Sequence, residues 1–227
     1  MKTLLSWSSG KDSAWTLHVL RRTPGVEISG LLTTVNETHG RVSMHGVRES
    51  LLDAQAAAAG LPLWRVGLPD ACDNAMYEEA MKTVLTWARD KGIEAVAFGD
   101  LFLEDIRAYR EKQMAPTGLK ALFPIWGTPT ASLAREMIEA GLRARLTCVD
   151  PKVLDRSFAG RAFDAALLAD LPAGVDPCGE RGEFHTFAWS GPMFTRPVPV
   201  QVGEIVERGG FVFADLLSEQ VEPSGGG

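Results

Sequence analysis

The residues with the clearest chemical potential lie near the N-terminus, in a segment that reads Ser-Ser-Gly-Lys-Asp-Ser over positions 8–13. Small residues let backbone N–H groups turn toward an anion, and Lys11 adds a positive charge beside three serine hydroxyls. An apolar run at 3–6 precedes the segment and a helical pattern at 13–22 follows it, so the positive end of that helix would face the same point. The pattern favours a phosphate-binding loop over its alternative, an ordinary turn with a polar helix cap. The candidate ligands are Ser8, Ser9, Gly10, Lys11, Asp12 and Ser13.

A carboxylate in such a loop needs a reason, because it repels phosphate. Asp12 fits if Mg²⁺ bridges it to phosphate oxygens. Gly99 and Asp100 follow another apolar run, and Asp100 is the second candidate magnesium ligand. Glu104 comes four positions later, on the same face of an expected helix. The loop is not a Walker A motif, because the G-x-x-x-x-G-K-[ST] spacing is absent.

A second group of reactive side chains lies at 176–187, which reads Asp-Pro-Cys-Gly-Glu-Arg-Gly-Glu-Phe-His-Thr-Phe. Glu180, Glu183 and His185 could bind a cation or an amine, or could exchange protons. The alternative is a charged hairpin in which His185 is satisfied within a turn. Cys178 could be a nucleophile, but no histidine partner is set by spacing, and a packing role is more typical of such a cysteine.

Alternating strand and helix patterns must position these groups. Apolar runs predict strands, and longer amphipathic stretches closed by glycine predict helices. The expected strands are 3–6, 26–35, 63–66, 95–98 and 121–126, and the expected helices are 13–22, 49–59, 74–91 and 103–114. This alternation predicts an α/β fold with a doubly wound parallel sheet. Ligands bind at the carboxyl ends of such strands, so loop 8–13 and Gly99–Asp100 should share one edge.

The second half of the chain changes character. Helices are expected at 130–140 and 160–169, and strands at 144–149, 184–189, 198–206 and 211–217. Arg208-Gly209-Gly210 is a hairpin signal between the last two strands. We therefore expect a nucleotide-binding domain at 1–126, a smaller α+β domain at 127–220 that binds the acceptor, and a disordered tail at 221–227.

Composition limits the functional classes. The 227 residues are 45% hydrophobic and 23% charged, with a formal net charge of −6. Without a basic excess, nucleic-acid binding is not expected. Three widely spaced cysteines argue against a disulfide framework and a cysteine-rich zinc site. With neither a signal peptide nor a long apolar run, the expectation is a cytoplasmic protein without a membrane span, and a homo-oligomer is one option for its assembly.

Loop 8–13 resembles the SGGKDS motif of the PP-loop ATP pyrophosphatases, with Ser9 in place of the usual first glycine. The segment 176–187, followed by Ser-Gly-Pro-Met-Phe at 190–194, is similar to the CGENGE[FY]HT…GP signature of diphthine–ammonia ligases and their bacterial relatives. Arg181 stands where that signature has asparagine. The segment 98–104 is similar to the family's GDI.LE, and 124–127 to its P-L-W-G, so the resemblance extends from residue 4 to about residue 194.

The resemblance implies an adenine nucleotide α-hydrolase (HUP-like) fold that uses ATP and Mg²⁺. It implies cleavage of ATP between the α and β phosphates, adenylation of a carboxylate, and attack by ammonia to give an amide and AMP. The expected catalytic residues are Lys11, Asp12, Glu183 and His185. Expected nucleotide contacts beyond loop 8–13 are Thr33, Thr34, Gly99 and Asp100, with Asp12 and Asp100 as magnesium ligands. Expected acceptor contacts are His45, Glu104, Trp126, Cys178, Gly179, Glu180, Glu183, His185 and Thr186.

The acceptor is expected to be a carboxylate on a small molecule or a protein. Richness in Ala, Leu, Arg and Gly is typical of a bacterial chain, and this favours an acceptor other than diphthine. No glutaminase signature is visible, so free ammonia is the expected nitrogen source. Two alternatives stay open: a non-catalytic adenine-nucleotide sensor and a PP-loop enzyme that modifies tRNA.

Overall fold

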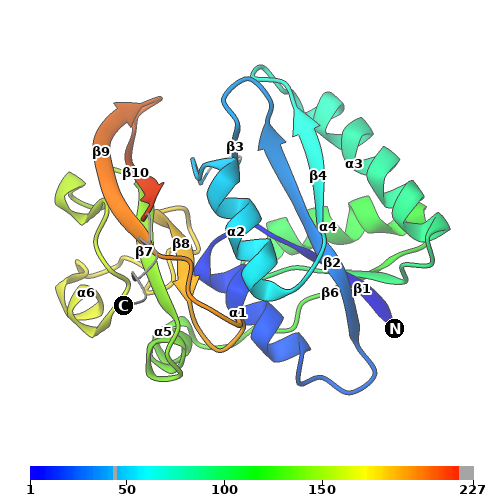
Figure 1. Ribbon diagram of the computed structural model, residues 1–227, viewed down its shortest axis with the longest axis horizontal. Coiled ribbons are helices and arrows are strands. Elements are labelled where there is room, and N and C mark those ends of the chain that lie inside the picture. The colour runs from blue at the N-terminus through cyan, green and yellow to red at the C-terminus, as the bar shows by residue number, and fades with distance from the viewer. Residues whose placement is uncertain (43–44, 220–227) are drawn as a thin grey trace, which may run out of the picture.

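The computed structural model describes residues 1–42 and 45–219, and the tail expected at 221–227 lies outside this range. Two β-sheets stand side by side, one in each half of the chain (Figure 1). Helices cover both faces of the first sheet, and the second sheet is antiparallel. The fold is therefore α/β with a mainly parallel first sheet and a smaller antiparallel sheet unit.

The first sheet follows the expected alternation. Its strands are β1 (Lys2–Ser6), β2 (Glu27–Asn36), β3 (Arg41–Val42), β4 (Leu63–Leu68), β5 (Ala95–Ala97) and β6 (Lys120–Leu122). Its helices are α1 (Lys11–Leu20), α2 (Glu49–Ala59), α3 (Asn74–Asp90) and α4 (Glu104–Met114), and a 3₁₀ turn, η1, spans Ala115–Thr117. The parallel strands run in the order β4-β2-β1-β5-β6. The order reverses direction between β1 and β5, and such a switch point opens a crevice for ligands at the carboxyl ends of the strands.

Two details of the first sheet differ from the sequence-based expectation. The two-residue strand β3 was not expected, and it pairs antiparallel with the end of β2. The strand expected at 121–126 ends at Leu122, and residues 124–127 form a turn instead. Pro124 explains this early end, since proline has no N–H to donate to a sheet ladder.

The second half contains four antiparallel strands in the order β8-β7-β10-β9. Its elements are α5 (Thr130–Glu139), β7 (Arg143–Val149), the 3₁₀ turn η2 (Arg156–Phe158), α6 (Ala165–Asp170), β8 (Phe184–Ser190), β9 (Val200–Arg208) and β10 (Phe211–Ser218). The expected hairpin joins β9 and β10, where Gly209 and Gly210 both have positive φ (57° and 83°).

The helix expected at 160–169 begins later, at Ala165. Residues before it pair with β7: Leu146 N donates to Arg161 O at 2.9 Å, and an isolated bridge joins Arg145 to Ala162. Asp164 then caps the helix by accepting a hydrogen bond from Leu167 N at 2.8 Å. The expectation was wrong here because pairing with a distant strand replaced local helical bonds.

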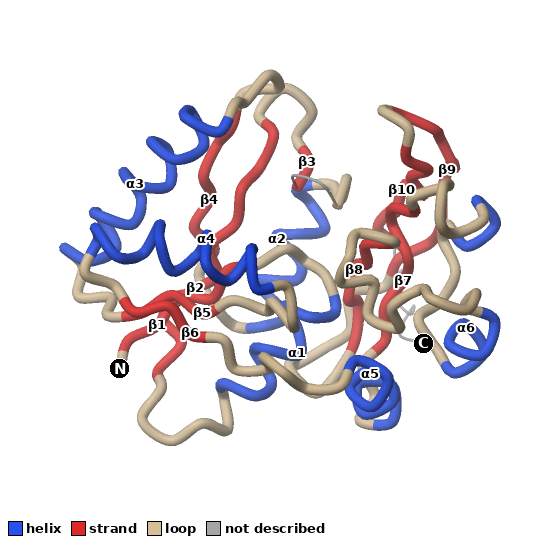
Figure 2. The backbone as a smooth tube through the Cα atoms, turned by 180° about the vertical axis from the view of Figure 1, so that it is seen from behind, coloured by secondary structure: helices blue, strands red, loops and turns tan. Residues whose placement is uncertain are grey.

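Helix α1 lies between the two sheets (Figures 1 and 2). Its side chains are buried on nearly every side, since β1 packs on one face and β8 on another. One hydrophobic core runs from Leu5 and Leu17 in the first half to Phe184 and Phe187 in the second. Both halves therefore hold the start of α1 in place. Among the described residues, none of the helices is both long and apolar enough to cross a membrane.

Candidate active site

The loop between β1 and α1 has a shape that its small residues make possible. Ser9 has a φ of 68°, the single positive value at a non-glycine position in the described chain. A Cβ on Gly10 would lie 3.0 Å from His45 Cε1 and 3.3 Å from Thr186 O. Ser13 Oγ donates to Gly10 O at 3.0 Å and lies 3.2 Å from Ser8 Oγ. The left-handed backbone of Ser9 and the missing Cβ of Gly10 therefore let the loop turn tightly against the second half of the chain.

Lys11 begins α1, and its side chain is buried. Its ammonium donates to Asp12 Oδ2 at 2.8 Å and also to the carbonyl oxygen of Cys178. The same nitrogen lies 5.4 Å from the ring centroids of Phe163 and Phe184. Burial alone would lower the pKa of Lys11, but the Asp12 carboxylate, together with the Cys178 and Glu180 side chains, outweighs burial and holds that pKa above its usual range. The ammonium is therefore a fixed positive charge between the two halves.

Two carboxylates at the sheet edge, those of Asp12 and Asp100, each have one oxygen without a hydrogen-bond partner. Asp12 Oδ1 and Asp100 Oδ2 are buried and have no hydrogen-bond partner. The loops approach closely, since a Cβ on Gly99 would lie 3.1 Å from both the Asp12 backbone and Thr16 Oγ1. Burial, opposed by the Lys11 charge, raises the pKa of Asp12, and burial opposed by Arg110 raises that of Asp100. Carboxylate oxygens without a hydrogen-bond partner are ligands that Mg²⁺ prefers, so the pair fits the expected Mg²⁺.

The described chain brings no three His, Cys, Asp or Glu side chains into one metal-binding group. Mg²⁺ commonly takes one or two protein carboxylates and completes its shell with phosphate oxygens and water, so Asp12 and Asp100 stay its predicted ligands. The carboxylates of Asp12 and Asp100 would hold that ion beside a bound triphosphate.

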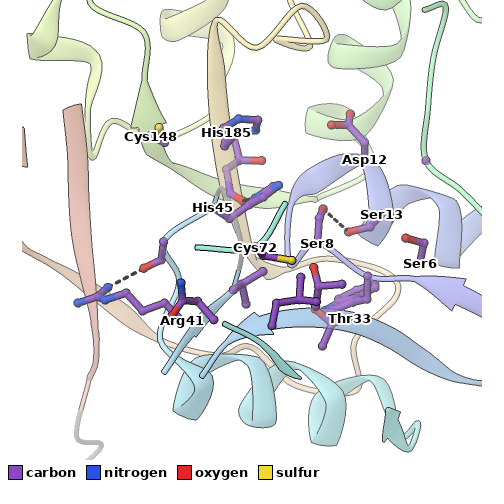
Figure 3. A pocket seen from close by; sticks show the side chains of 18 of the residues that line it. Ser6, Ser8, Asp12, Ser13, Thr33, Arg41, His45, Cys72, Cys148 and His185 are labelled. Carbon is purple, nitrogen blue, oxygen red and sulfur yellow. Dashed lines mark hydrogen bonds between the residues drawn. The ribbon is translucent and has the colours of Figure 1, made fainter. Parts of the chain in front are cut away.

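Two imidazole rings meet on the opposite wall (Figure 3). The centroids of His45 and His185 are 4.7 Å apart, and His45 Nδ1 lies 3.1 Å from Thr186 O. Since a carbonyl oxygen only accepts, Nδ1 carries the proton and Nε2 keeps its lone pair. Burial, aided by His185 and Lys11, lowers the pKa of His45 to about 3. Burial and the Lys11 charge lower the pKa of His185 to about 4, so both rings are neutral at physiological pH.

These groups line a single cavity of about 1130 Å³ at the carboxyl edge of the first sheet. Figure 3 shows Ser8, Asp12, His45 and His185 around the same space. The expected site residues on its wall are Ser8, Lys11, Asp12, Ser13, Thr33, Thr34, His45, Gly99, Asp100, Cys178, Gly179, His185 and Thr186. Residues far apart in the sequence therefore meet where both motifs were expected to act.

Six of the expected site residues do not line the cavity: Ser9, Gly10, Glu104, Trp126, Glu180 and Glu183. Glu183 is buried, and its two oxygens accept the backbone N–H groups of Asp176 (3.0 Å) and Arg181 (2.9 Å). The structure does not place Glu183 on the cavity wall, and its expected catalytic role stays a prediction. Glu183 shapes the loop that carries His185.

Glu180 connects the two motifs rather than facing the acceptor space. Its Oε1 accepts the Leu101 N–H at 2.7 Å, which holds the Asp100 loop against the 176–187 segment. Burial raises the pKa of Glu180 to about 7, against the lowering effect of that hydrogen bond. Glu104 is exposed on α4, and Trp126 packs on Phe123 with ring centroids 5.9 Å apart. Both therefore lie outside the cavity wall.

Cys178 is buried, and its sulfur donates to Thr130 O at 3.5 Å. Burial raises the pKa of this thiol far above its usual range, although Lys11 opposes the shift. A thiol held protonated is a poor nucleophile, and this favours a packing role for the Cys178 side chain. Its backbone carbonyl oxygen accepts the hydrogen bond from the Lys11 ammonium.

Sequence reasoning missed two residues of this region. Arg110 lines the cavity from α4, and its buried Nε has no hydrogen-bond partner but forms an ion pair with Asp100 Oδ2 at 3.6 Å. Its guanidinium carbon lies 5.1 Å from the Phe98 ring centroid. Its position on the helix that follows Gly99–Asp100 was the available signal. Gln55 is fully buried beneath the loop, and nothing in the Ala-rich pattern of its helix singled it out.

Comparison with known proteins identifies the family. The model of the diphthamide synthase N-terminal domain matches residues 1–121, and that of the diphthamide synthase C-terminal domain matches residues 129–215. A U34-tRNA thiolase, NcsA from Methanococcus maripaludis, shares 18% identity at a TM-score of 0.39, over 61% of this chain and 56% of that one. That likeness is too low to bear on the function.

Curated relatives named diphthine–ammonia ligase match at low identity. The Schizosaccharomyces pombe protein is 27% identical over 91% of this chain, which spans only 37% of that relative. The Danio rerio protein is 27% identical, with 75% of this chain and 72% of the relative covered. The Homo sapiens protein is 25% identical, with 73% and 67% covered. Both family models together span most of the sequence, and the chain therefore belongs to the diphthamide synthase family.

Proposed function

We propose that this protein is an ATP-dependent ligase that adenylates a carboxylate, releases pyrophosphate, and transfers ammonia to form an amide. One observation carries the proposal: loop 8–13 and the 176–187 segment are bonded to each other along one cavity. Lys11 N donates to Thr186 Oγ1 at 3.0 Å, and the Lys11 ammonium donates to Cys178 O. A nucleotide seated in the loop would therefore place its α-phosphate beside the segment that carries His185.

The first step is substitution at the α-phosphorus. A carboxylate oxygen forms a bond to that phosphorus, the bond to the β-phosphate oxygen breaks, and pyrophosphate leaves toward loop 8–13. Backbone N–H groups, the hydroxyls of Ser8 and Ser13, and the positive end of α1 receive its charge. Mg²⁺ at Asp12 and Asp100 would supply further neutralisation of that charge. The chain's contribution is mainly positioning and electrostatics.

The second step is attack of ammonia on the acyl carbon of the adenylate. A carbon–nitrogen bond forms, the carbon–oxygen bond to AMP breaks, and one proton is released with the AMP. His45 and His185 present neutral rings, and the free Nε2 of His45 can accept a hydrogen bond from ammonia. Neutral rings suit this task because a charged imidazolium would have no lone pair to offer.

The acceptor enters from the side of the cavity away from the first sheet's core. Arg41 and Arg48 line the cavity on this side. Both form ion pairs with Asp215 of β10, with nitrogen–oxygen distances of 3.0 Å and 2.6 Å. We propose a carboxylate acceptor on a small molecule or a protein, and diphthine is one member of that class because the relatives carry it in their names. Free ammonia is the proposed nitrogen source.

A pyrophosphate-release assay with ATP, Mg²⁺, ammonium and a panel of carboxylic acids tests the proposal. The panel includes elongation factor bearing diphthine and a set of small metabolite acids. Pyrophosphate and AMP should appear in equal amounts with at least one acid. ATP binding without pyrophosphate release for any acid would instead support a nucleotide sensor, and tight tRNA binding at physiological salt would support a tRNA-modifying enzyme.

A further inference from the structure

Gln55 of α2 occupies a position that connects three segments of the site. Its side chain is fully buried, and both ends of its amide are bonded. Gln55 Oε1 accepts from Trp7 Nε1 at 3.0 Å, while Nε2 donates to Ser9 O at 2.9 Å and to Ala188 O at 2.6 Å. Trp7 and Ser9 lie between β1 and α1, and Ala188 belongs to β8, three residues after His185.

Ser9 needs support from its surroundings. Its left-handed φ of 68° is unfavourable for a residue with a Cβ, and such conformations persist only where neighbours enforce them. The Ser9 hydroxyl is buried without a hydrogen-bond partner, so it does not provide that support. The support comes through the Ser9 carbonyl, which accepts from Gln55 Nε2 and from Ala188 N at 3.0 Å.

We infer that Gln55 is a positioning residue, which holds Ser9 in its left-handed conformation and thereby fixes the turn that places Ser8, Gly10 and the start of α1 beside the triphosphate. This inference rests on the proposed function for its ligand, but its geometry is independent of the acceptor. It also makes Ser9 and Gln55 a functional pair: glycine at position 9 adopts the same φ freely and needs the anchor less.

The chemistry at position 55 requires an amide. Two carbonyl oxygens face Nε2, so the position needs two donors there and one acceptor toward Trp7. Glutamate has nearly the same size but places an acceptor against both carbonyls. Gln55→Glu therefore changes hydrogen bonding with little change in volume, and Gln55→Met removes all polar contacts while keeping the length of the side chain.

The matched control lies on the same interface. Thr195 donates to Ala58 O of α2 through its hydroxyl at 2.9 Å and its N–H at 2.8 Å, away from the loop. Thr195→Val removes only the hydroxyl bond. All variants are first checked by circular dichroism and thermal melting, so that affinity is compared only between folded proteins.

Calorimetric titration with ATP and Mg²⁺ gives the first readout. We expect the Kd of Gln55→Glu to rise by about tenfold or more, because both hydrogen bonds donated by Nε2 are lost. The Kd of Thr195→Val should stay within about twofold of wild type. In a Ser9→Gly background, Gln55→Glu should raise the Kd by only about threefold or less, because glycine adopts the left-handed φ at position 9 without a hydrogen bond from Gln55. Equal losses in both backgrounds would overturn the inference.

Hydrogen exchange of the full chain without nucleotide gives the second readout. Gln55→Glu should speed exchange at residues 7–13 and at Ala188, whereas Thr195→Val should not. Unchanged exchange there would overturn the inference even if the protein binds ATP. If wild type binds no ATP and the exchange still changes as expected, the proposed function fails while the positioning role of Gln55 stands.

Discussion

Replacing Lys11 by methionine tests how strongly its buried ammonium stabilises the fold through its pairing with Asp12. In the structure the charge faces Asp12 Oδ2 and Cys178 O in a buried position between the halves. Lys11→Met removes the charge but keeps the length of the side chain. It leaves the Asp12 carboxylate and the Cys178 carbonyl without their partner.

The magnitude follows from the burial of the pair. Removing one partner of a buried ion pair costs about 3–5 kcal/mol, because the remaining charge is uncompensated. The Asp12 side chain keeps 26% of its exposure, so water relieves part of that cost and the lower end of the range applies. We expect Lys11→Met to lower the free energy of unfolding by about 3 kcal/mol, and the Lys11→Met/Asp12→Asn double variant to recover most of that loss.

Urea unfolding followed by tryptophan fluorescence and circular dichroism measures this free energy. Lys82→Met is the control, because Lys82 forms an exposed pair with Glu79 at 3.8 Å and its loss should change stability by less than about 0.5 kcal/mol. A loss below about 1 kcal/mol for Lys11→Met would refute the reasoning, since it would mean that the ammonium is hydrated rather than paired.

Three further predictions concern the loop and its pH dependence. Gly10→Ala should raise the Kd for ATP by about tenfold in titration, because its methyl group would press on His45 and Thr186; affinity equal to wild type would contradict the close approach. Ser9→Gly should raise the urea midpoint slightly, since relief of about 1 kcal/mol of backbone strain outweighs the added freedom of the unfolded chain, and a lower midpoint would contradict it. The pKa of Glu180 is raised from 4.5 to about 7, so between these pH values the folded state binds a proton that the unfolded chain does not. The stability that this group contributes is therefore lost as the pH rises from 4.5 to about 7. Glu180→Gln should remove that loss, which is measured as the pH dependence of the urea midpoint between these values. The same pH dependence in the variant and in wild type would contradict this prediction.

His45 and His185 act in the opposite direction over the same pH range. Their pKa values lie below 6.5 in the folded state, so the unfolded chain binds more protons and stability rises as pH increases from about 3–4 to 6.5. The Glu180 effect must therefore be taken as the difference between variant and wild type.

Much of the fold could be read from local patterns, because apolar runs and glycine caps mark the ends of strands and helices. The meeting of loop 8–13 with Gly99–Asp100 followed from the rule that parallel strands share one carboxyl edge. The helix expected at 160–169 failed for the opposite reason: residues 161–162 pair with β7, and local propensity does not contain such distant partners.

The site was predictable by residue type but not by role. The Glu-x-x-Glu-x-His spacing in the 176–187 segment indicated chemistry, yet which side chain faces the cavity depends on loop hydrogen bonds that no spacing reveals. Glu183 turned inward to bond backbone N–H groups, while His185 turned toward His45 from the other half of the chain. Arg110 and Gln55 acquire their importance only from packing between elements.

The most direct test of the central claim follows oxygen from the acceptor to the nucleotide. An acceptor carboxylate labelled with oxygen-18 is turned over with ATP, Mg²⁺ and ammonium, and the products are analysed by mass spectrometry. Adenylation predicts AMP that carries one labelled oxygen, unlabelled pyrophosphate, and an amide that retains the other label. Label in inorganic phosphate together with ADP, or AMP without label, would contradict attack of the carboxylate on the α-phosphate.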